Sequence, residues 1–128
     1  MILKLNTKGL SSMDKDNWHY IQKIKFYAET IVDFTKNETY TSFTKNQQIN
    51  FAISFSLIQI GEAAGNLRKS FTDKYNHIPW KNITGIRHRV VHDYEGSNMS
   101  ILWEAATESI PELIIQVNYL IESLEKEH

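Results

Sequence analysis

Apolar residues recur every three or four positions along most of the chain, which is the spacing of one face of an α-helix. The first such stretch begins after Asp14 or Asp16, either of which can cap a helix, and runs to about Asn37. Its expected inward face is formed by Trp18, Ile21, Ile24, Ala28, Ile31 and Val32. The pattern therefore predicts a long amphipathic helix in the first third of the chain.

A second and longer helix is predicted to begin after Thr41 or Ser42 and to run to about Lys69, at the centre of the fold. Its inward face is expected to consist of Ile49, Ala52, Ile53, Ser56, Ile60, Ala63, Ala64 and Leu67. Gly61 and Gly65 lie in its second half, where each glycine costs about 1 kcal/mol relative to alanine. We therefore expect another helix to pack closely against both glycines.

Two further helical stretches follow a loop that is expected over residues 73–79. A third helix is predicted from Trp80 to about His92, and its inward positions are Ile83, Ile86, Val90 and Val91. The last helix contains Pro111, which should kink or restart it near Ser109 because proline lacks the amide donor. The predicted fold class is all-α, a four- to five-helix antiparallel bundle.

The length of 128 residues corresponds to a single domain, and the 41% of hydrophobic residues are enough for one packed core. Residues 1–12 lack the continuous apolar core of a signal peptide and are interpreted as an N-terminal tail, followed by a helical domain over residues 13–128. The absence of cysteine excludes disulfides, a thiolate nucleophile and thiolate metal sites. The longest apolar run, residues 51–60, is too short to span a membrane. Together these features predict a cytoplasmic protein.

The formal net charge of -1 conceals an uneven distribution of charge along the chain. Residues 68–92 contain six basic residues and one acid, whereas residues 93–128 contain eight acids and one basic residue. A local basic stretch beside an acidic one allows a phosphate-binding cleft on a surface that otherwise repels nucleic acid. Segregated charges can equally be solvated helix faces, so charge alone leaves both interpretations open.

The chemically unusual stretch covers residues 85–94, with two arginines, two histidines and a tyrosine close together. His88 and His92 are four positions apart on one helix face, a spacing that can bind a metal ion. We predict no metal site, because Asp93 is the only nearby third ligand and the flanking arginines would repel a cation. In a purely structural interpretation, Arg87 ties helices together and His92 caps the end of its helix.

The same residues fit metal-free cleavage of RNA, in which the ribose 2′-hydroxyl attacks the adjacent phosphorus. Histidine titrates near neutral pH, so His92 can act as base or acid, and Arg87 offers a permanently charged donor fork for phosphate oxygens. Five helical positions correspond to a rotation of roughly 140°, so Arg87 and His92 do not share a face of one ideal helix. A two-fold dimer would supply two copies of each residue to a single cleft.

Arg87, His92 and Tyr94 form the pattern R-x4-H-x-Y, which resembles the signature of HEPN-domain ribonucleases, specifically the HepT toxins of HepT/MntA-type toxin–antitoxin modules. Segments over residues 60–64, 78–80, 102–104 and 110–113 also resemble this family. The resemblance extends from about residue 13 to about residue 124. The full pattern is specific, whereas R-x4-H alone is common by chance.

What the resemblance implies is a homodimeric bundle whose two motifs meet in a cleft and cut RNA without metal or cofactor. The implied catalytic residues are Arg87 and His92, and the candidate supporting residues are Glu62, His88 and Arg89. The family's partner is a minimal, MntA-like nucleotidyltransferase antitoxin, which transfers AMP from ATP to the motif tyrosine, here the site of AMPylation Tyr94. The chain is thus expected to be the toxin of a type VII-like toxin–antitoxin system.

Alternatives remain open at two levels. Glu62 can orient Arg87 or His92, but an exposed helix charge explains it equally well. The alternative function is a non-catalytic HEPN subunit that binds nucleotide or positions substrate for a partner nucleotidyltransferase. A plain helical interaction module is a third option, although it leaves Tyr94 and the two histidines without a role.

Overall fold

The computed structural model describes residues 12–95 and 98–127, except for the side chains of residues 12, 13 and 93–95. Within these ranges the chain is helical and contains no strand, which confirms the predicted all-α class. Residues 1–11, most of the expected N-terminal tail, lie outside the described part. The segments are α1 (Ser12–Thr35), α2 (Tyr40–Lys45), α3 (Gln47–Gly65), α4 (Lys69–Lys74), α5 (Trp80–Thr84), α6 (Ile86–Glu95), α7 (Met99–Glu104), the π-helix η1 (Ala105–Ser109) and α8 (Ile110–Glu127).

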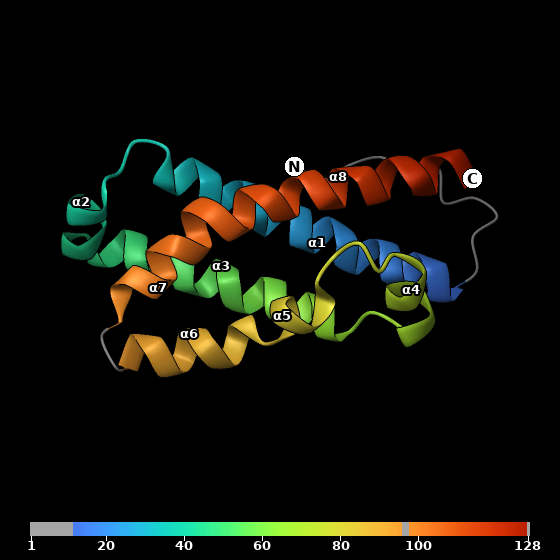
Figure 1. Ribbon diagram of the computed structural model, residues 1–128, viewed down its shortest axis with the longest axis horizontal. Coiled ribbons are helices and arrows are strands. Elements are labelled where there is room, and N and C mark those ends of the chain that lie inside the picture. The colour runs from blue at the N-terminus through green and yellow to red at the C-terminus, as the bar shows by residue number, and fades with distance from the viewer. Residues whose placement is uncertain (1–11, 96–97, 128) are drawn as a thin grey trace.

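The four longest α-helices, α1, α3, α6 and α8, form the bundle. Figure 1 shows that each of them runs in the direction opposite to the one before it along the chain. α3 packs against α1, α2, α5 and α6, and α1 packs in turn against α8 and η1, so α3 is the central helix. None of the helices in the described residues combines the length and apolar character that crossing a membrane requires.

Apolar side chains from every bundle helix meet in one core. α1 buries Trp18, Ile21, Ile24, Ala28 and Ile31, and α3 buries Ile53, Ser56, Leu57, Ile60, Ala63 and Ala64. The inward faces predicted for these two helices are therefore confirmed, with Val32, Ile49 and Ala52 half-buried at their edges. α8 closes the core with Ile110, Leu113, Val117, Leu120 and Ile121.

α1 begins at Ser12, earlier than the predicted caps Asp14 and Asp16, and ends at Thr35. The earlier start places Asp14 within the first helical turn. A carboxylate there interacts favourably with the positive end of the helix dipole, so an acid near a helix start need not be the cap itself.

The prediction of one continuous second helix is wrong, because the chain breaks at Asn46 and again after Gly65. Asn46 has an extended backbone, and its side-chain oxygen accepts a hydrogen bond of 3.0 Å from the Ile49 amide. The buried Asn50 amide group donates to the carbonyl oxygens of Phe43 and Asn46, both at 2.9 Å. The side chains of Asn46 and Asn50 therefore pair with backbone groups that the break leaves open, although the buried Asn50 Oδ1 atom has no hydrogen-bond partner among the described residues.

α2 begins at Tyr40 and not after Thr41 or Ser42 as predicted. The Thr39 hydroxyl accepts a hydrogen bond from the Ser42 amide at 3.1 Å, and the Ser42 hydroxyl accepts one from the Thr39 amide at 2.9 Å. This reciprocal arrangement is a capping box in which serine takes the place of the usual glutamate or glutamine.

The expected loop over residues 73–79 is partly helical, because α4 extends to Lys74. The buried Trp80 indole donates to the Tyr75 carbonyl oxygen at 3.0 Å, which holds the turn before α5. The third predicted helix is also not continuous, since Gly85 separates α5 from α6. The Gly85 amide donates back to the Lys81 carbonyl at 3.2 Å and closes the last turn of α5.

The expected disturbance of the last helix at Pro111 takes the form of the π-helix η1. The amide of Ile110 donates to the carbonyl of Ala105, five residues back, and α8 then starts at Ile110. Proline has no amide hydrogen and its ring crowds the preceding turn, so a wider turn just before Pro111 relieves both problems. The helical path thus continues from α7 into α8 with a change of hydrogen-bond register.

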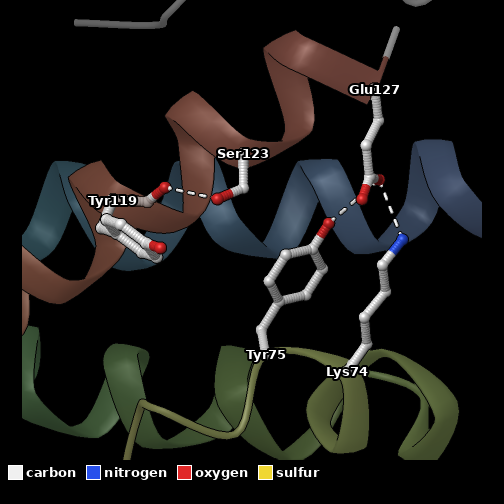
Figure 2. A network of polar contacts seen from close by, with 5 residues as sticks. All are labelled: Lys74, Tyr75, Tyr119, Ser123 and Glu127. Atoms are coloured by element: carbon white, nitrogen blue, oxygen red, sulfur yellow. Dashed lines mark hydrogen bonds and ion pairs between the residues drawn. The ribbon is translucent and has the colours of Figure 1, made fainter.

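The C-terminal end of α8 is tied to the segment after α3 by a polar network around Glu127. Figure 2 shows Lys74 and Tyr75 reaching across to this carboxylate. Its Oε2 atom accepts hydrogen bonds from the Lys74 ammonium at 2.9 Å and the Tyr75 hydroxyl at 3.2 Å. Burial, followed by the charge of Glu127, raises the pKa of Tyr75, and the hydrogen bond to Glu127 raises the pKa of Lys74.

Candidate functional site

The predicted motif lies on α6, which docks on the bundle through one apolar edge. Ile86 and Val90 are buried, whereas Arg87, His88, Arg89 and His92 are exposed. Val91 was predicted to face the core but is 47% exposed. A short helix on the outside of the bundle needs only a narrow apolar stripe, and the i and i+4 pair of Ile86 and Val90 provides it.

Gly61 sets how closely α6 approaches α3. A Cβ atom placed on Gly61 would lie 3.2 Å from the Arg87 backbone nitrogen and 3.3 Å from the Ile83 carbonyl oxygen. The expected close packing is therefore confirmed at Gly61, but Gly65 is exposed with no neighbour within 4 Å of such an atom. Gly65 is the last residue of α3, where the helix ends and no other helix approaches.

Arg87 and Glu62 form an ion pair across the α3–α6 contact. Their side chains remain 63% and 41% exposed respectively, so the pair lies at the surface of the bundle. Gly61, the residue before Glu62, brings the two backbones together and thereby places the carboxylate within reach of the guanidinium. The site accordingly holds one permanent cation in a defined direction, at a place accessible to a phosphate group.

His92 is exposed at the other side of α6 and faces His88, one helical turn earlier. The two imidazole rings are parallel, with an interplanar angle of 1° and centroids 6.2 Å apart. Among the described contacts, none joins Arg87 to His92 within one chain. This separation agrees with the rotation expected for five helical positions.

Arg89 points to a different part of the surface. Its guanidinium donates to the Asn82 carbonyl oxygen at 3.1 Å, back towards α5. Together with Asn82, Ile86 and Gln116, Arg89 lines a groove between α5–α6 and α8. Arg89 is thus not grouped with Arg87.

Tyr94 belongs to α6, but its side chain lies outside the described part of the protein. The backbone nevertheless continues helically from His92 through Tyr94 to Glu95. Within the described residues, no group of three or more metal-ligating side chains comes together.

Sequence reasoning missed one feature beside the site, a pair of exposed aromatic residues on α3. Phe51 and Phe55 are 52% and 55% exposed, and an edge-on contact of 6.0 Å joins Phe55 to Tyr27 of α1. Phe51, Phe55 and Glu62 are spaced by four and seven positions, so they follow one stripe along α3. The predicted inward face of this helix left both phenylalanines out, but no role was inferred from that.

The fold and the site together define a class: an α-helical bundle that displays a paired arginine and exposed histidines on one outer helix. The chain belongs to the HepT-like ribonuclease family, because the protein-family model described as "Ribonuclease HepT-like" matches residues 24–120. This finding confirms the resemblance inferred from the R-x4-H-x-Y pattern.

Several curated relatives cover most of the chain. It is 38% identical to "Putative RNase TTE0752" of Caldanaerobacter subterraneus subsp. tengcongensis, over 80% of this chain and 92% of the relative. It is 35% identical to "Putative RNase MJ1216" of Methanocaldococcus jannaschii, over 83% of this chain and 88% of the relative. It is 30% identical to "Probable ribonuclease HepT" of Thermococcus cleftensis, over 79% of this chain and 92% of the relative. No solved structure gives a significant match.

Proposed function

We propose that this protein is a metal-independent endoribonuclease that uses Arg87 and His92. The observation that carries the proposal is the ion pair between Glu62 and Arg87, which holds an exposed guanidinium in place on the helix that also exposes His92. Membership of the HepT-like ribonucleases supplies the reaction class. The alternative, a non-catalytic subunit, gives no chemical reason to display both groups on α6.

The proposed chemistry is an attack of the ribose 2′-hydroxyl oxygen on the adjacent phosphorus. His92 accepts the proton of the 2′-hydroxyl while the new bond to phosphorus forms. The bond from phosphorus to the 5′-oxygen breaks, and that oxygen receives a proton from a protonated imidazole, which leaves a 2′,3′-cyclic phosphate. Arg87 stabilises the negative charge that develops on the other phosphate oxygens.

Two imidazoles in opposite protonation states are needed in this scheme, and we propose that a second copy of the chain provides one of them. The exposed pair of Phe51 and Phe55 supports a homodimer, because it follows the same α3 stripe as Glu62. When two copies pack against each other through these phenylalanines, their α6 helices can lie on either side of one cleft.

The direct test is cleavage of a single-stranded RNA by the purified protein in the presence of excess EDTA. Cleavage should continue, and its products should carry a 2′,3′-cyclic phosphate and a free 5′-hydroxyl. Methylation of the 2′-hydroxyl should abolish cutting at that nucleotide. Loss of activity in EDTA, or cleavage of the methylated RNA at the same position, would contradict the proposal.

We further propose that the protein is the toxin of a type VII-like toxin–antitoxin pair whose nucleotidyltransferase partner adds AMP to Tyr94. The tyrosine oxygen would attack the α-phosphorus of ATP, lose its proton and release pyrophosphate. The added phosphate diester carries a negative charge beside Arg87 and would compete with RNA for it. Tyr94→Phe removes the accepting oxygen, so the variant should escape neutralisation when it is co-expressed with the antitoxin.

Mass spectrometry checks the modification directly. The mass of one or more adenylates should appear on the tryptic peptide that contains Tyr94, and not on the separate tryptic peptide that contains Tyr75. Neutralised protein that carries no adenylate would show that the antitoxin acts by another route. Such a result would leave the ribonuclease proposal intact.

A further inference from the structure

His88 was a candidate supporting residue, but the cleavage steps proposed above assign it no part. It lies one helical turn before His92, and both side chains are exposed. Their rings are parallel at an interplanar angle of 1°, with centroids 6.2 Å apart. The parallel rings do not converge on one point as they stand, but exposed histidines at positions i and i+4 of a helix can each rotate to turn a neutral imidazole nitrogen towards a shared ion.

The flanking arginines, which are expected from the sequence to repel a cation, are both directed elsewhere. Arg87 is paired with the carboxylate of Glu62 on α3, which offsets its charge. Arg89 donates to the carbonyl oxygen of Asn82 at 3.1 Å, so its guanidinium is turned back towards α5. The electrostatic repulsion of a cation between His88 and His92 is therefore weaker than the order of residues in the sequence indicates.

We propose that His88 and His92 form a two-imidazole site for a divalent transition-metal ion such as Zn²⁺ or Ni²⁺, and that its occupation inhibits the enzyme. Each imidazole donates a nitrogen lone pair and replaces one water of the hydrated ion, without any change of oxidation state. We assign the remaining coordination positions to water; among the described side chains, none joins the pair as a third ligand. Mg²⁺, which prefers oxygen ligands, should not bind there.

The inhibitory consequence rests on the proposed function, since it depends on His92 transferring protons. A lone pair that is shared with a metal ion cannot accept the proton of the 2′-hydroxyl. The ion also places positive charge next to His92 and opposes the protonated form that the leaving oxygen requires. The same histidine therefore serves catalysis when free and binds a metal when paired with His88.

Metal binding can be measured on the full-length protein without RNA. Titration with Zn²⁺ or Ni²⁺ should give one site per chain by calorimetry, and Zn²⁺ should shift the imidazole NMR signals of His88 and His92 together. His88→Ala should weaken the affinity by about tenfold or more, because one of two linked ligands is lost. His19→Ala, which removes an exposed histidine of α1, is the matched control and should leave the affinity unchanged. Equal affinity of all three proteins would overturn the proposal.

Inhibition is measured as the ratio of cleavage rates with and without the ion, so that any change in basal rate cancels. Micromolar Zn²⁺ should suppress cleavage by the wild type and by His19→Ala, and EDTA should restore it. The half-inhibitory concentration for His88→Ala should rise by about tenfold or more. Zn²⁺ that binds at His88 without slowing cleavage would overturn the inhibitory role. A protein that never cuts RNA would contradict the proposed function, and calorimetry would still test the site.

Discussion

The carboxylate of Glu62 on α3 is paired with the guanidinium of Arg87 on α6, and 41% and 63% of the two side chains remain exposed. A pair this exposed contributes only about 0–1 kcal/mol to stability, so its main effect is to orient Arg87. Glu62→Gln should leave the melting temperature nearly unchanged. It should lower kcat/KM for RNA cleavage by about ten- to a hundredfold, because the guanidinium loses its fixed direction.

Asp73→Asn is the matched control for the loss of a surface ion pair. It removes the pair between Lys69 and Asp73 on α4, whose side chains are 88% and 62% exposed. Cleavage by this variant should equal that of the wild type. Equal activity of Glu62→Gln and Asp73→Asn would mean that Glu62 is only a solvated charge.

The pairing of Glu62 with Arg87 also marks the limit of prediction from sequence. Residue types and the R-x4-H-x-Y spacing were enough to single out the helix of the proposed site, because arginine and histidine are chemically distinctive there. The partner of Arg87 lies 25 positions earlier in the chain, on another helix. Local periodicity contains no information about that contact. The sequence therefore left two interpretations of Glu62 open, a residue that orients Arg87 or His92 and an exposed helix charge.

The fold likewise contains features that the sequence pattern predicts and features that it does not. The inward faces of α1 and α3 follow directly from apolar spacing, because burial repeats with the helical turn. The breaks at Asn46 and Gly85 do not follow from it, since the apolar pattern continues through both. Asn46 ends one helix and caps the next through its own side chain, an arrangement that is visible only once hydrogen-bond partners are known.

Gly61 and Gly65 form a natural pair for testing the approach of α6 to α3. Gly65→Ala should raise the free energy of unfolding by up to about 1 kcal/mol, because alanine favours the helix and meets nothing within 4 Å. Gly61→Ala gains the same helix preference but places a methyl group 3.2 Å from the backbone of Arg87. Overpacking of this kind costs about 1–3 kcal/mol, so Gly61→Ala should be the less stable variant in urea unfolding.

Cleavage assays on the same two variants connect packing with activity. Displacement of α6 moves Arg87 relative to Glu62, so Gly61→Ala should also cut RNA more slowly under conditions where it is fully folded. Gly65→Ala should cut at the wild-type rate. Equal stability and equal cleavage rates of the two variants would show that Gly61 does not set the position of α6.

His92 and Arg87 should differ in what their removal does to the reaction. His92→Ala eliminates proton transfer and should lower kcat by about 10²- to 10⁴-fold while leaving most of the RNA affinity in place. Arg87→Ala removes a phosphate contact and should weaken both binding and kcat. Single-turnover rates and RNA binding at equal salt separate the two effects. A His88→Ala variant as damaged in kcat as His92→Ala would contradict the assignment of roles within the motif.

The network around Glu127 predicts a loss of stability at alkaline pH. Burial and the charge of Glu127 raise the pKa of Tyr75 above 10.0, its usual value. As pH rises, the unfolded chain therefore loses the Tyr75 proton before the folded chain does, and the free energy of unfolding falls. Tyr75→Phe should reduce this fall in thermal unfolding from about pH 9 to about pH 11. Some fall should remain, because the hydrogen bond to Glu127 also raises the pKa of Lys74.

Tyr119→Phe serves as the control for alkaline unfolding. Tyr119 lies on the same helix as Glu127 but is 61% exposed. Its removal should leave the pH dependence of the wild type intact. An identical pH dependence for Tyr75→Phe and the wild type would show that the Tyr75 hydroxyl is not held by Glu127 in solution.

The exposed aromatic stripe on α3 tests the composite site. Phe55 is 55% exposed, so Phe55→Glu should fold normally as a monomer, but a charge at the centre of the proposed interface should separate the two copies. Sedimentation at micromolar concentration should show the wild type near twice 15.0 kDa and Phe55→Glu near 15.0 kDa, with cleavage lost in the variant. Tyr119→Glu introduces the same charge at a 61% exposed aromatic position on α8 and should remain an active dimer. A monomeric Phe55→Glu that still cuts RNA at the wild-type rate would show that one chain holds a complete site, and the second imidazole would then have to come from within it.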